Sequence, residues 1–298
     1  MHRVLITGVG GFIGSALAKF CSSQNETIGT IHSTDAPEES VLGQILRLDV
    51  RDSGQVCEAI SRYSPTTIIH CAAFNGIIPC ARNPDLAIEV NVHGTENIAR
   101  AAEKVGAKLV YLSTDIVFNG GKGNYSEDDL PDPICTYGKT KLEAEEVVKS
   151  VCSIYIVGRV ALVYGINRYR KRFTEQVIES LQRGDKIQLF SDEYRSQIYL
   201  PVLCNTLVEL ATGDLNGTYH LCGNDSISRL EFGLELARVF GLNPNLIMPT
   251  TSADFQSDEK RPLNCSMTNG KLRRDLKTEM PSLREALKEL HQEYQRIS

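Results

Sequence analysis

A phenol and an ammonium group lie four residues apart in the segment Tyr137-Gly138-Lys139-Thr140-Lys141. On a helix, side chains at this spacing project from one face and can converge. A free phenol has a pKa of about 10, and a nearby cation lowers that pKa by favouring phenolate. We therefore expect Tyr137 to serve as a general acid in carbonyl reduction, with Lys141 lowering its pKa.

The elements around the pair decide whether it is reactive, because a tyrosine and a lysine at this spacing on an exposed helix are usually solvent-exposed side chains without a catalytic role. The pair follows a β-branched and apolar run, 108–112, that ends in Ser113-Thr114-Asp115. This order places Thr114 at the carboxyl end of a predicted strand, where doubly wound folds bind their ligands. The Thr114 hydroxyl can hydrogen-bond a substrate carbonyl alongside Tyr137.

Strands and helices alternate through the first half of the chain. The pattern predicts strands at 4–6, 27–31, 45–48, 67–70, 108–112 and 153–157, and helices at 13–21, 56–63, 87–104 and 140–149. Such alternation specifies a parallel sheet covered on both faces. The expected fold class is α/β, a doubly wound parallel sheet of the Rossmann type.

The rhythm changes after Gly165. A helical stretch at 173–183, a return through 199–211, a helix at 229–240 and a Pro/Ser-rich passage at 244–262 precede terminal helices. We predict a nucleotide-binding domain over 1–165, rejoined by segments near 199–222. A smaller C-terminal α/β substrate lobe is predicted over 166–298.

Glycines at 8, 11 and 14 follow the first predicted strand and open a helix, in Gly8-Val9-Gly10-Gly11-Phe12-Ile13-Gly14. In a dinucleotide site, the first glycine allows a tight turn, the second lets the backbone approach the pyrophosphate, and the third lets the helix pack closely on the strand. Unpaired N–H groups at the helix start then bind phosphate. The segment predicts dinucleotide binding, and Lys141 can hold the nicotinamide ribose.

The second strand ends in His32-Ser33 without the carboxylate that usually binds the ribose 2′-hydroxyl of NAD. NADP is therefore favoured as the cofactor, although nearby Asp35 leaves NAD possible. Asp49-Val50, after the third strand, has the acidic and apolar pairing that meets adenine in such domains. Its alternative role is to cap the next helix.

Composition is that of an ordinary globular protein, with 42% hydrophobic and 23% charged residues among 298. The formal net charge of −5 argues against nucleic acid, whose phosphates favour a basic face. No apolar run approaches the roughly 18 residues of a membrane helix, and Met1-His2-Arg3 leads into a predicted strand instead of a signal peptide. We expect a cytoplasmic protein without nucleic-acid or membrane partners.

Nine cysteines are scattered without a CxxC pair or a cluster at zinc spacing. Free thiols in a reducing compartment, and no metal site, are the simple interpretation. Cys80 and Cys135 fall in predicted loops near Tyr137. A redox-sensitive thiol is one hypothesis there, and ordinary packing of a small residue is the alternative.

Further segments extend the pattern of the glycine turn and the Tyr/Lys pair. They are Ser113-Thr114-Asp115-Ile116-Val117-Phe118, Tyr137 through Glu145, Val163-Tyr164-Gly165, Gly217-Thr218-Tyr219-His220 and Arg261-Pro262-Leu263-Asn264. With these segments the chain resembles the extended short-chain dehydrogenases/reductases over nearly its whole length. Within that superfamily it is most similar to the dTDP-4-dehydrorhamnose reductases.

This resemblance implies a catalytic set of Thr114, Tyr137 and Lys141, the last two also contacting the cofactor. It implies that Cys71-Ala72-Ala73 lines the cofactor and that Asn91 supports the central helix.

Related dehydratases carry Thr-Asp-Glu where this chain has Thr114-Asp115-Ile116. Without that glutamate, elimination of water lacks its general base, so the resemblance implies reduction of a 4-keto nucleotide sugar. Thr114, Asp115, Arg195 and Arg261 are its expected contacts. Guanidinium groups bind phosphate oxygens in pairs, so Arg195 and the basic stretch 168–172 are candidates for the substrate diphosphate. A solvated helix start is the alternative for that stretch.

The loop 74–82 departs from the acidic, lysine-bearing version of the rhamnose reductases, which leaves the sugar open. The main alternative function is regulatory. The methionine adenosyltransferase beta subunit shares the fold and has similar Tyr-Gly-Lys-Thr-Lys and Arg-Pro-x-Asn segments, and such a protein binds NADP(H) and a partner. A homodimer is usual in the superfamily, but the sequence has no exposed apolar seam that decides it.

Overall fold

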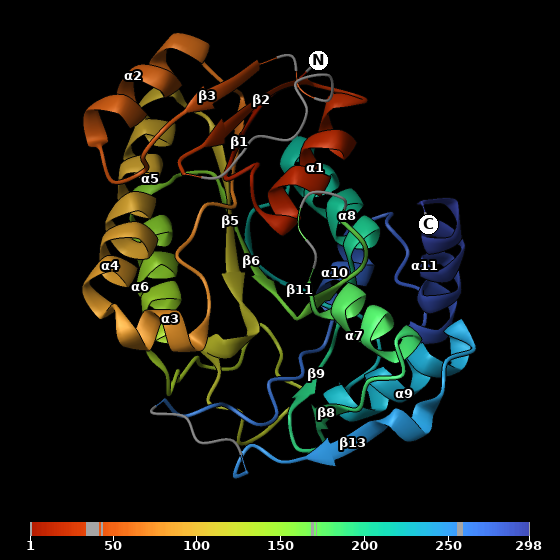
Figure 1. The fold of residues 1–298 in the computed structure, drawn as a ribbon. Helices are drawn as coiled ribbons and strands as arrows, with labels where there is room; N and C mark the ends of the chain where they lie inside the picture. Colours follow the sequence, from red (N-terminus) through yellow and green to blue (C-terminus); the bar gives the residue numbers. More distant parts are fainter. Residues whose placement is uncertain are drawn as a thin grey trace.

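Seven parallel strands form one central sheet in the computed structural model, which describes residues 2–33, 42, 44–167, 170, 172–254 and 259–297. Their order is β11-β6-β5-β4-β1-β2-β3 (Figure 1), and every pair is parallel. The strands are β1 (Arg3–Thr7), β2 (Glu26–Ile31), β3 (Gln44–Arg47), β4 (Thr67–His70), β5 (Lys108–Thr114), β6 (Tyr155–Val160) and β11 (Gly217–Leu221). This arrangement confirms the predicted doubly wound α/β fold.

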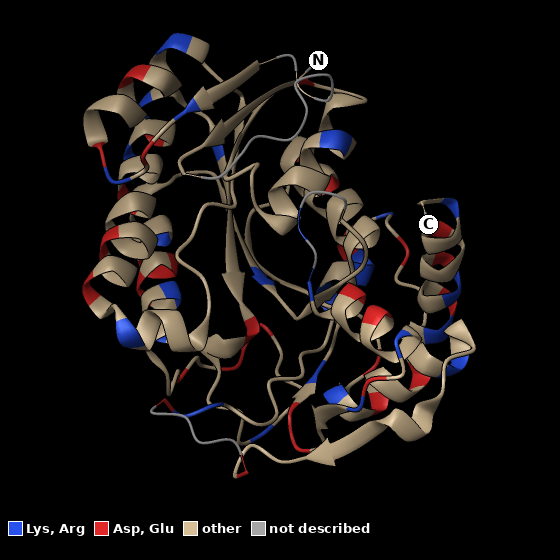
Figure 2. Ribbon diagram, viewed as in Figure 1, with Lys and Arg blue, Asp and Glu red and all other residues tan. Residues whose placement is uncertain are grey.

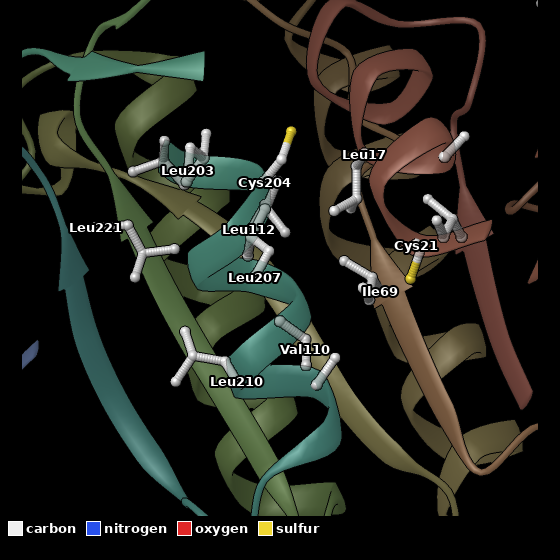
Figure 3. Packing of buried hydrophobic residues seen from close by; sticks show 14 of the residues in the cluster. Leu17, Cys21, Ile69, Val110, Leu112, Leu203, Cys204, Leu207, Leu210 and Leu221 are labelled. Atoms are coloured by element: carbon white, nitrogen blue, oxygen red, sulfur yellow. The ribbon is translucent and has the colours of Figure 1, made fainter. Parts of the chain in front are cut away.

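Helices cover both faces of the sheet. One face carries α2 (Ser53–Tyr63), α5 (Gly94–Val105) and α6 (Thr136–Val151), and the other carries α1 (Phe12–Ser22) and α8 (Leu200–Thr212). Neighbouring strand residues point to opposite faces. Leu109 and Tyr111 accordingly pack with α5 and α6, whereas Val110 and Leu112 pack with α1 and α8 (Figure 3).

A second apolar core lies in the C-terminal half, between α7 (Phe173–Gln182), α9 (Arg229–Phe240) and α11 (Leu283–Ile297). Three two-stranded sheets accompany it, β10-β7, β12-β9 and β13-β8. Their strands are β7 (Val163–Tyr164), β8 (Ile187–Phe190), β9 (Tyr194–Arg195), β10 (Ile198–Tyr199), β12 (Ile227–Ser228) and β13 (Ile247–Thr250); η4 (Pro244–Leu246) and α10 (Gly270–Asp275) complete this half. The boundary at residue 165 stays a prediction.

Two predicted helices differ most from the observed ones, and the helix expected over 56–63 begins earlier, at Ser53. α6 begins at Thr136 instead of residue 140, because Gly138, a poor helix former, interrupts the sequence pattern without ending the helix. The helix expected over 87–104 is α4 (Pro84–Ile88), a π-helical turn η2 (Glu89–His93) and then α5. Such π turns often mark functional sites.

The helices around the sheet carry Lys/Arg and Asp/Glu interspersed (Figure 2). None of the helices in the described ranges is both long and apolar enough to cross a membrane.

Candidate functional site

The glycine-rich turn between β1 and α1 forms a cradle without side chains. Gly8 has a φ of +74°, and a Cβ atom there would lie 2.9 Å from the Ala72 backbone. A Cβ on Gly14 would lie 2.3 Å from the Gly8 carbonyl oxygen. No side chain caps the start of α1, whose N-cap is Gly11. Its N–H groups therefore suit a phosphate, and Phe12 and Ile13 open the helix beside it.

His32 and Ser33 lie exposed just after β2. Arg47 donates to the His32 carbonyl, and the His32 ring lies 3.4 Å from the Asp49 carboxylate. Hydrogen bonds from Arg51 lower the pKa of Asp49 to about 2. The Asp35 carboxyl, on which the NAD alternative depended, lies outside the described residues.

Asp49 does not cap the next helix, so that alternative is wrong. The N-cap of α2 is Asp52, whose carboxylate accepts the Gln55 N–H. Val50 is buried, and its side chain would lie 2.7 Å from a Cβ on Gly94. Close packing of α5 on Val50 thus fixes the loop that carries Asp49.

A ladder of buried hydrogen bonds runs from the segment after β4 toward α5, and sequence reasoning missed it. The Ala72 N–H donates to Thr7 Oγ1, which lies 2.7 Å from His70 Nδ1. His70 Nε2 lies 3.2 Å from Thr95 Oγ1, and that hydroxyl donates to the Asn91 carbonyl. Burial lowers the pKa of His70 to about 3, so the ring is neutral. The ladder assigns its proton to Nε2 and fixes the Cys71-Ala72-Ala73 backbone next to Gly8.

Asn91 joins the same region to the catalytic helix. Its Oδ1 accepts the Phe74 N–H, and its Nδ2 donates to the Phe74 carbonyl and to Thr140 Oγ1. Thr140 in turn donates to the Tyr137 carbonyl. The side chain lies in the π turn η2 and holds α6 in place, which is the support that the family resemblance implied.

Tyr137 is buried, with 9% of its surface exposed. The pKa of its hydroxyl is raised, first by burial and then by Cys80, Asp115 and Cys135. Sequence reasoning expected Lys141 to lower this pKa, but burial raises it instead. Tyr137 therefore holds its proton firmly near neutral pH.

The thiols beside Tyr137 are less reactive than their predicted loop positions suggested. Cys80 lies on α3 (Ile77–Arg82) and Cys135 is the N-cap of α6, and both are fully buried. Burial raises the pKa of Cys80 to about 11 and raises that of Cys135 as well. Oxidation requires an exposed thiolate, so these observations favour the packing alternative over a redox-sensitive thiol.

Lys141 is buried one helical turn after Tyr137. Its Nζ lies 4.2 Å from the centroid of the Tyr111 ring. Burial lowers the pKa of Lys141 to about 7, against the opposing effect of Glu145. The ammonium therefore stands near its protonation midpoint at neutral pH.

Thr114 ends β5, and Asp115 begins the 3-10 turn η3 (Asp115–Val117). The Thr114 hydroxyl donates to Asp115 Oδ1 at 3.2 Å. Asp115 is buried and lies 3.3 Å from Arg195 Nε. Burial raises its pKa, and Arg195 partly offsets this. Thr114 thus lies at the carboxyl end of β5, and Asp115 next to it is near enough to Tyr137 to raise the pKa of its hydroxyl.

Arg195 is not placed to bind a substrate diphosphate, contrary to the sequence-based expectation. It is buried, and its Nη1 and Nη2 donate to the carbonyls of Tyr194, Leu263 and Pro262. Its Nε faces Asp115. These contacts commit the guanidinium to joining β9, η3 and the segment 262–263.

Arg261 and Arg229 share the buried carboxylate of Glu193. Burial raises the pKa of Glu193, but the three arginines around it outweigh that effect and hold the pKa below its usual value. Arg229, which begins α9, was not predicted, because nothing in its local sequence marks it. We call Arg195, Arg229, Arg261, Glu193 and Asp115 the arginine cluster.

From the basic stretch 168–172, Arg170 donates to the Gly10 carbonyl of the glycine-rich turn. Arg172 is the N-cap of α7. The remaining members, Arg168, Tyr169 and Lys171, lie outside the described residues. The described part of the stretch therefore faces the cofactor cradle and the start of a helix.

Comparisons with known proteins identify the family of the chain. Residues 1–296 match the family model described as RmlD substrate binding domain. The probable low-salt glycan biosynthesis reductase Agl14 of Haloferax volcanii is 28% identical over 95% of both chains. The mouse methionine adenosyltransferase 2 subunit beta is 30% identical, over 91% of this chain and 81% of its own.

A solved structure has the same arrangement. The dTDP-4-dehydrorhamnose reductase of Bacillus anthracis, in complex with NADP, superposes with a TM-score of 0.85 and 29% identity. The match covers 98% of this chain and 99% of the other. Since the family model spans almost every residue, this chain belongs to the RmlD substrate binding domain family.

Proposed function

We propose that this chain reduces the 4-keto group of a nucleotide sugar with NADPH. The observation that carries the proposal is the burial of Tyr137 and Lys141 on one helix beside the carboxyl end of β5, where Thr114 lies. The similar reductases of Haloferax volcanii and Bacillus anthracis support the reaction class.

The cofactor fits the residues present. The cradle at Gly8 and Gly14 has no room for side chains and ends at uncapped N–H groups, which suit a diphosphate. Arg47, which donates to the His32 carbonyl, and Arg51 supply positive charge at the end of β2, which suits the 2′-phosphate of NADP. When bound, NADPH supplies the hydride that the carbonyl carbon accepts.

The protein supplies the proton and the orientation. Tyr137 donates its hydroxyl proton to the carbonyl oxygen, and Thr114 hydrogen-bonds the same oxygen. Because burial raises its pKa, Tyr137 is fully protonated beforehand and releases the proton only as negative charge develops on that oxygen. Lys141 holds the nicotinamide ribose. Ile116 offers no carboxylate for water elimination, which favours reduction over dehydration.

The test is NADPH oxidation by the purified protein across a panel of 4-keto nucleotide sugars. Turnover of at least one sugar, with the matching alcohol as product, is expected. Cofactor binding without turnover of any of them would contradict the proposal.

A regulatory role is the second candidate, favoured by the mouse methionine adenosyltransferase 2 subunit beta at 30% identity. In that case the protein binds NADP(H) and a synthetase without turnover. Size-exclusion chromatography with and without a methionine adenosyltransferase separates the two functions. We place the protein in the cytoplasm, because its nine cysteines are free thiols.

A further inference from the structure

The ammonium of Lys141 rests on an aromatic ring instead of a carboxylate. Its Nζ is 4.2 Å from the centroid of Tyr111, and both side chains are buried. Within the described part of the chain, Nζ has no hydrogen bond or salt bridge. A desolvated cation over a ring face gains stabilisation from the quadrupole of the ring.

The Tyr111 ring is held rigidly. It lies in the middle of β5, fully buried in the core between the sheet, α5 and α6. The His70 ring packs 5.9 Å from it, and the Tyr111 hydroxyl lies 3.5 Å from the Lys141 carbonyl. The ring therefore cannot turn away from the ammonium without disturbing the core.

The other ionisable groups around Lys141 do not replace the ring. They are Tyr137 and Glu145 on α6, His70 and Cys71 at the end of β4, and Cys80 on α3. Glu145 is already paired with Arg159 at 2.9 Å and accepts the Ser113 hydroxyl. Burial keeps His70 neutral and raises the pKa of Cys80 to about 11 and that of Cys71 to about 12, so both thiols stay protonated.

We propose that Tyr111 is a positioning residue, whose ring face holds the charged ammonium of Lys141 at the ligand edge of the sheet. The inference rests on the proposed function, because it assigns Lys141 to the nicotinamide ribose. It adds that Tyr111 sets the pH range over which Lys141 can bind that ribose.

The test compares two substitutions. Tyr111→Phe keeps the ring and removes the hydroxyl, whereas Tyr111→Leu removes the ring. NADPH affinity is measured by fluorescence titration from about pH 6 to 9, a range that spans the Lys141 pKa of about 7. Because every variant keeps the same cofactor and the same other side chains, the pH dependence that these contribute cancels in the comparison.

Wild type and Tyr111→Phe should lose affinity together as the pH rises through about 7. In Tyr111→Leu the loss should begin about one pH unit lower, a tenfold change in the protonation equilibrium. Tyr111→Met is a second ringless variant in case the leucine variant does not fold. Two results would overturn the proposal. One is an equal loss of NADPH affinity at every pH in Tyr111→Leu. The other is a wild-type affinity that does not change with pH.

No sugar is present in this titration. Failure to find a reducible sugar would therefore count against the proposed function and leave the pH shift intact, whereas an absent shift with normal turnover would count against Tyr111 alone.

Discussion

Lys141 and Arg195 are both buried cations near the end of β5, yet the protein holds them in opposite ways. Arg195 donates to three backbone carbonyls and faces the Asp115 carboxylate. Lys141 rests on the face of the Tyr111 ring. A guanidinium stays charged throughout the range in which proteins fold, whereas an ammonium with a pKa of about 7 gains and loses its proton near neutrality.

This difference in partners distinguishes a structural cation from one that is available to a ligand. Arg195 joins β9, η3 and the segment 262–263, which lie far apart in sequence, and it has little capacity left for a ligand. None of the described residues forms a hydrogen bond or salt bridge with Lys141 Nζ, so its N–H groups stay available to a ligand. A buried cation with all its partners internal is structural, and one without them is a candidate for function.

The largest expected effect is on catalysis by Tyr137, one helical turn before Lys141. Tyr137→Phe removes the only proton that we assign to the carbonyl oxygen, so kcat for sugar reduction should fall by about 10²- to 10⁴-fold. NADPH affinity, measured by fluorescence, should change little. Unchanged cofactor oxidation with a sugar that wild type reduces would rule out Tyr137 as the general acid.

Arg195→Met tests the structural role of Arg195. It leaves Asp115 buried without its cation, so the free energy of unfolding in urea should fall by about 3–5 kcal/mol. The matched control is Arg183→Met, since Arg183 pairs with Asp185 on the surface. That change should cost about 0–1 kcal/mol. Weaker sugar binding at wild-type stability would instead make Arg195 a substrate ligand.

Gly14→Ala tests the cradle that serves the same ligand edge. The new methyl group would meet the Gly8 carbonyl oxygen at 2.3 Å, so the turn must shift. We expect about 1–3 kcal/mol lower stability and weaker NADPH binding. Gly270→Ala is the control, because nothing lies within 4 Å of a Cβ there. Equal NADPH affinity in the two variants would show that the cradle does not contact the diphosphate.

The features that can be predicted from the sequence are those that depend on the spacing of nearby residues. Alternating strands and helices dictate the sheet, and the spacing of Gly8, Gly11 and Gly14 dictates the turn. Tyr137 and Lys141 share a helix face because of a four-residue spacing, and Gly138 between them displaced only the predicted start of that helix.

The rest depends on contacts between distant segments. No spacing reveals that His70 bridges Thr7 and Thr95, or that Arg229 shares Glu193 with Arg261. Arg195 looks like a phosphate ligand until its carbonyl partners are known. The raised pKa of Tyr137 is likewise a property of burial, which residue spacing does not report.

Lys141→Met gives the smallest expected effect and the sharpest contrast between the two cations. The pKa of Lys141 is about 7 in the folded protein and 10.5 in a model compound. Between these values the unfolded chain binds more protons than the folded one, so the free energy of unfolding rises with pH. The rise from this group is at most about 1.4 kcal/mol per pH unit. Lys141→Met should remove it, while Arg195→Met should not.

Urea unfolding without cofactor at about pH 7.5 and 9 measures the slope for each variant. Lys139→Met, at an exposed lysine of the same helix, is the control and should keep the wild-type slope. The slope of each variant is compared with that of wild type, because thiols and tyrosines titrate in the same pH range. An identical slope in wild type and Lys141→Met would mean that Lys141 stays charged to higher pH. In that case the two buried cations would be held equally firmly, and the contrast between them would fail.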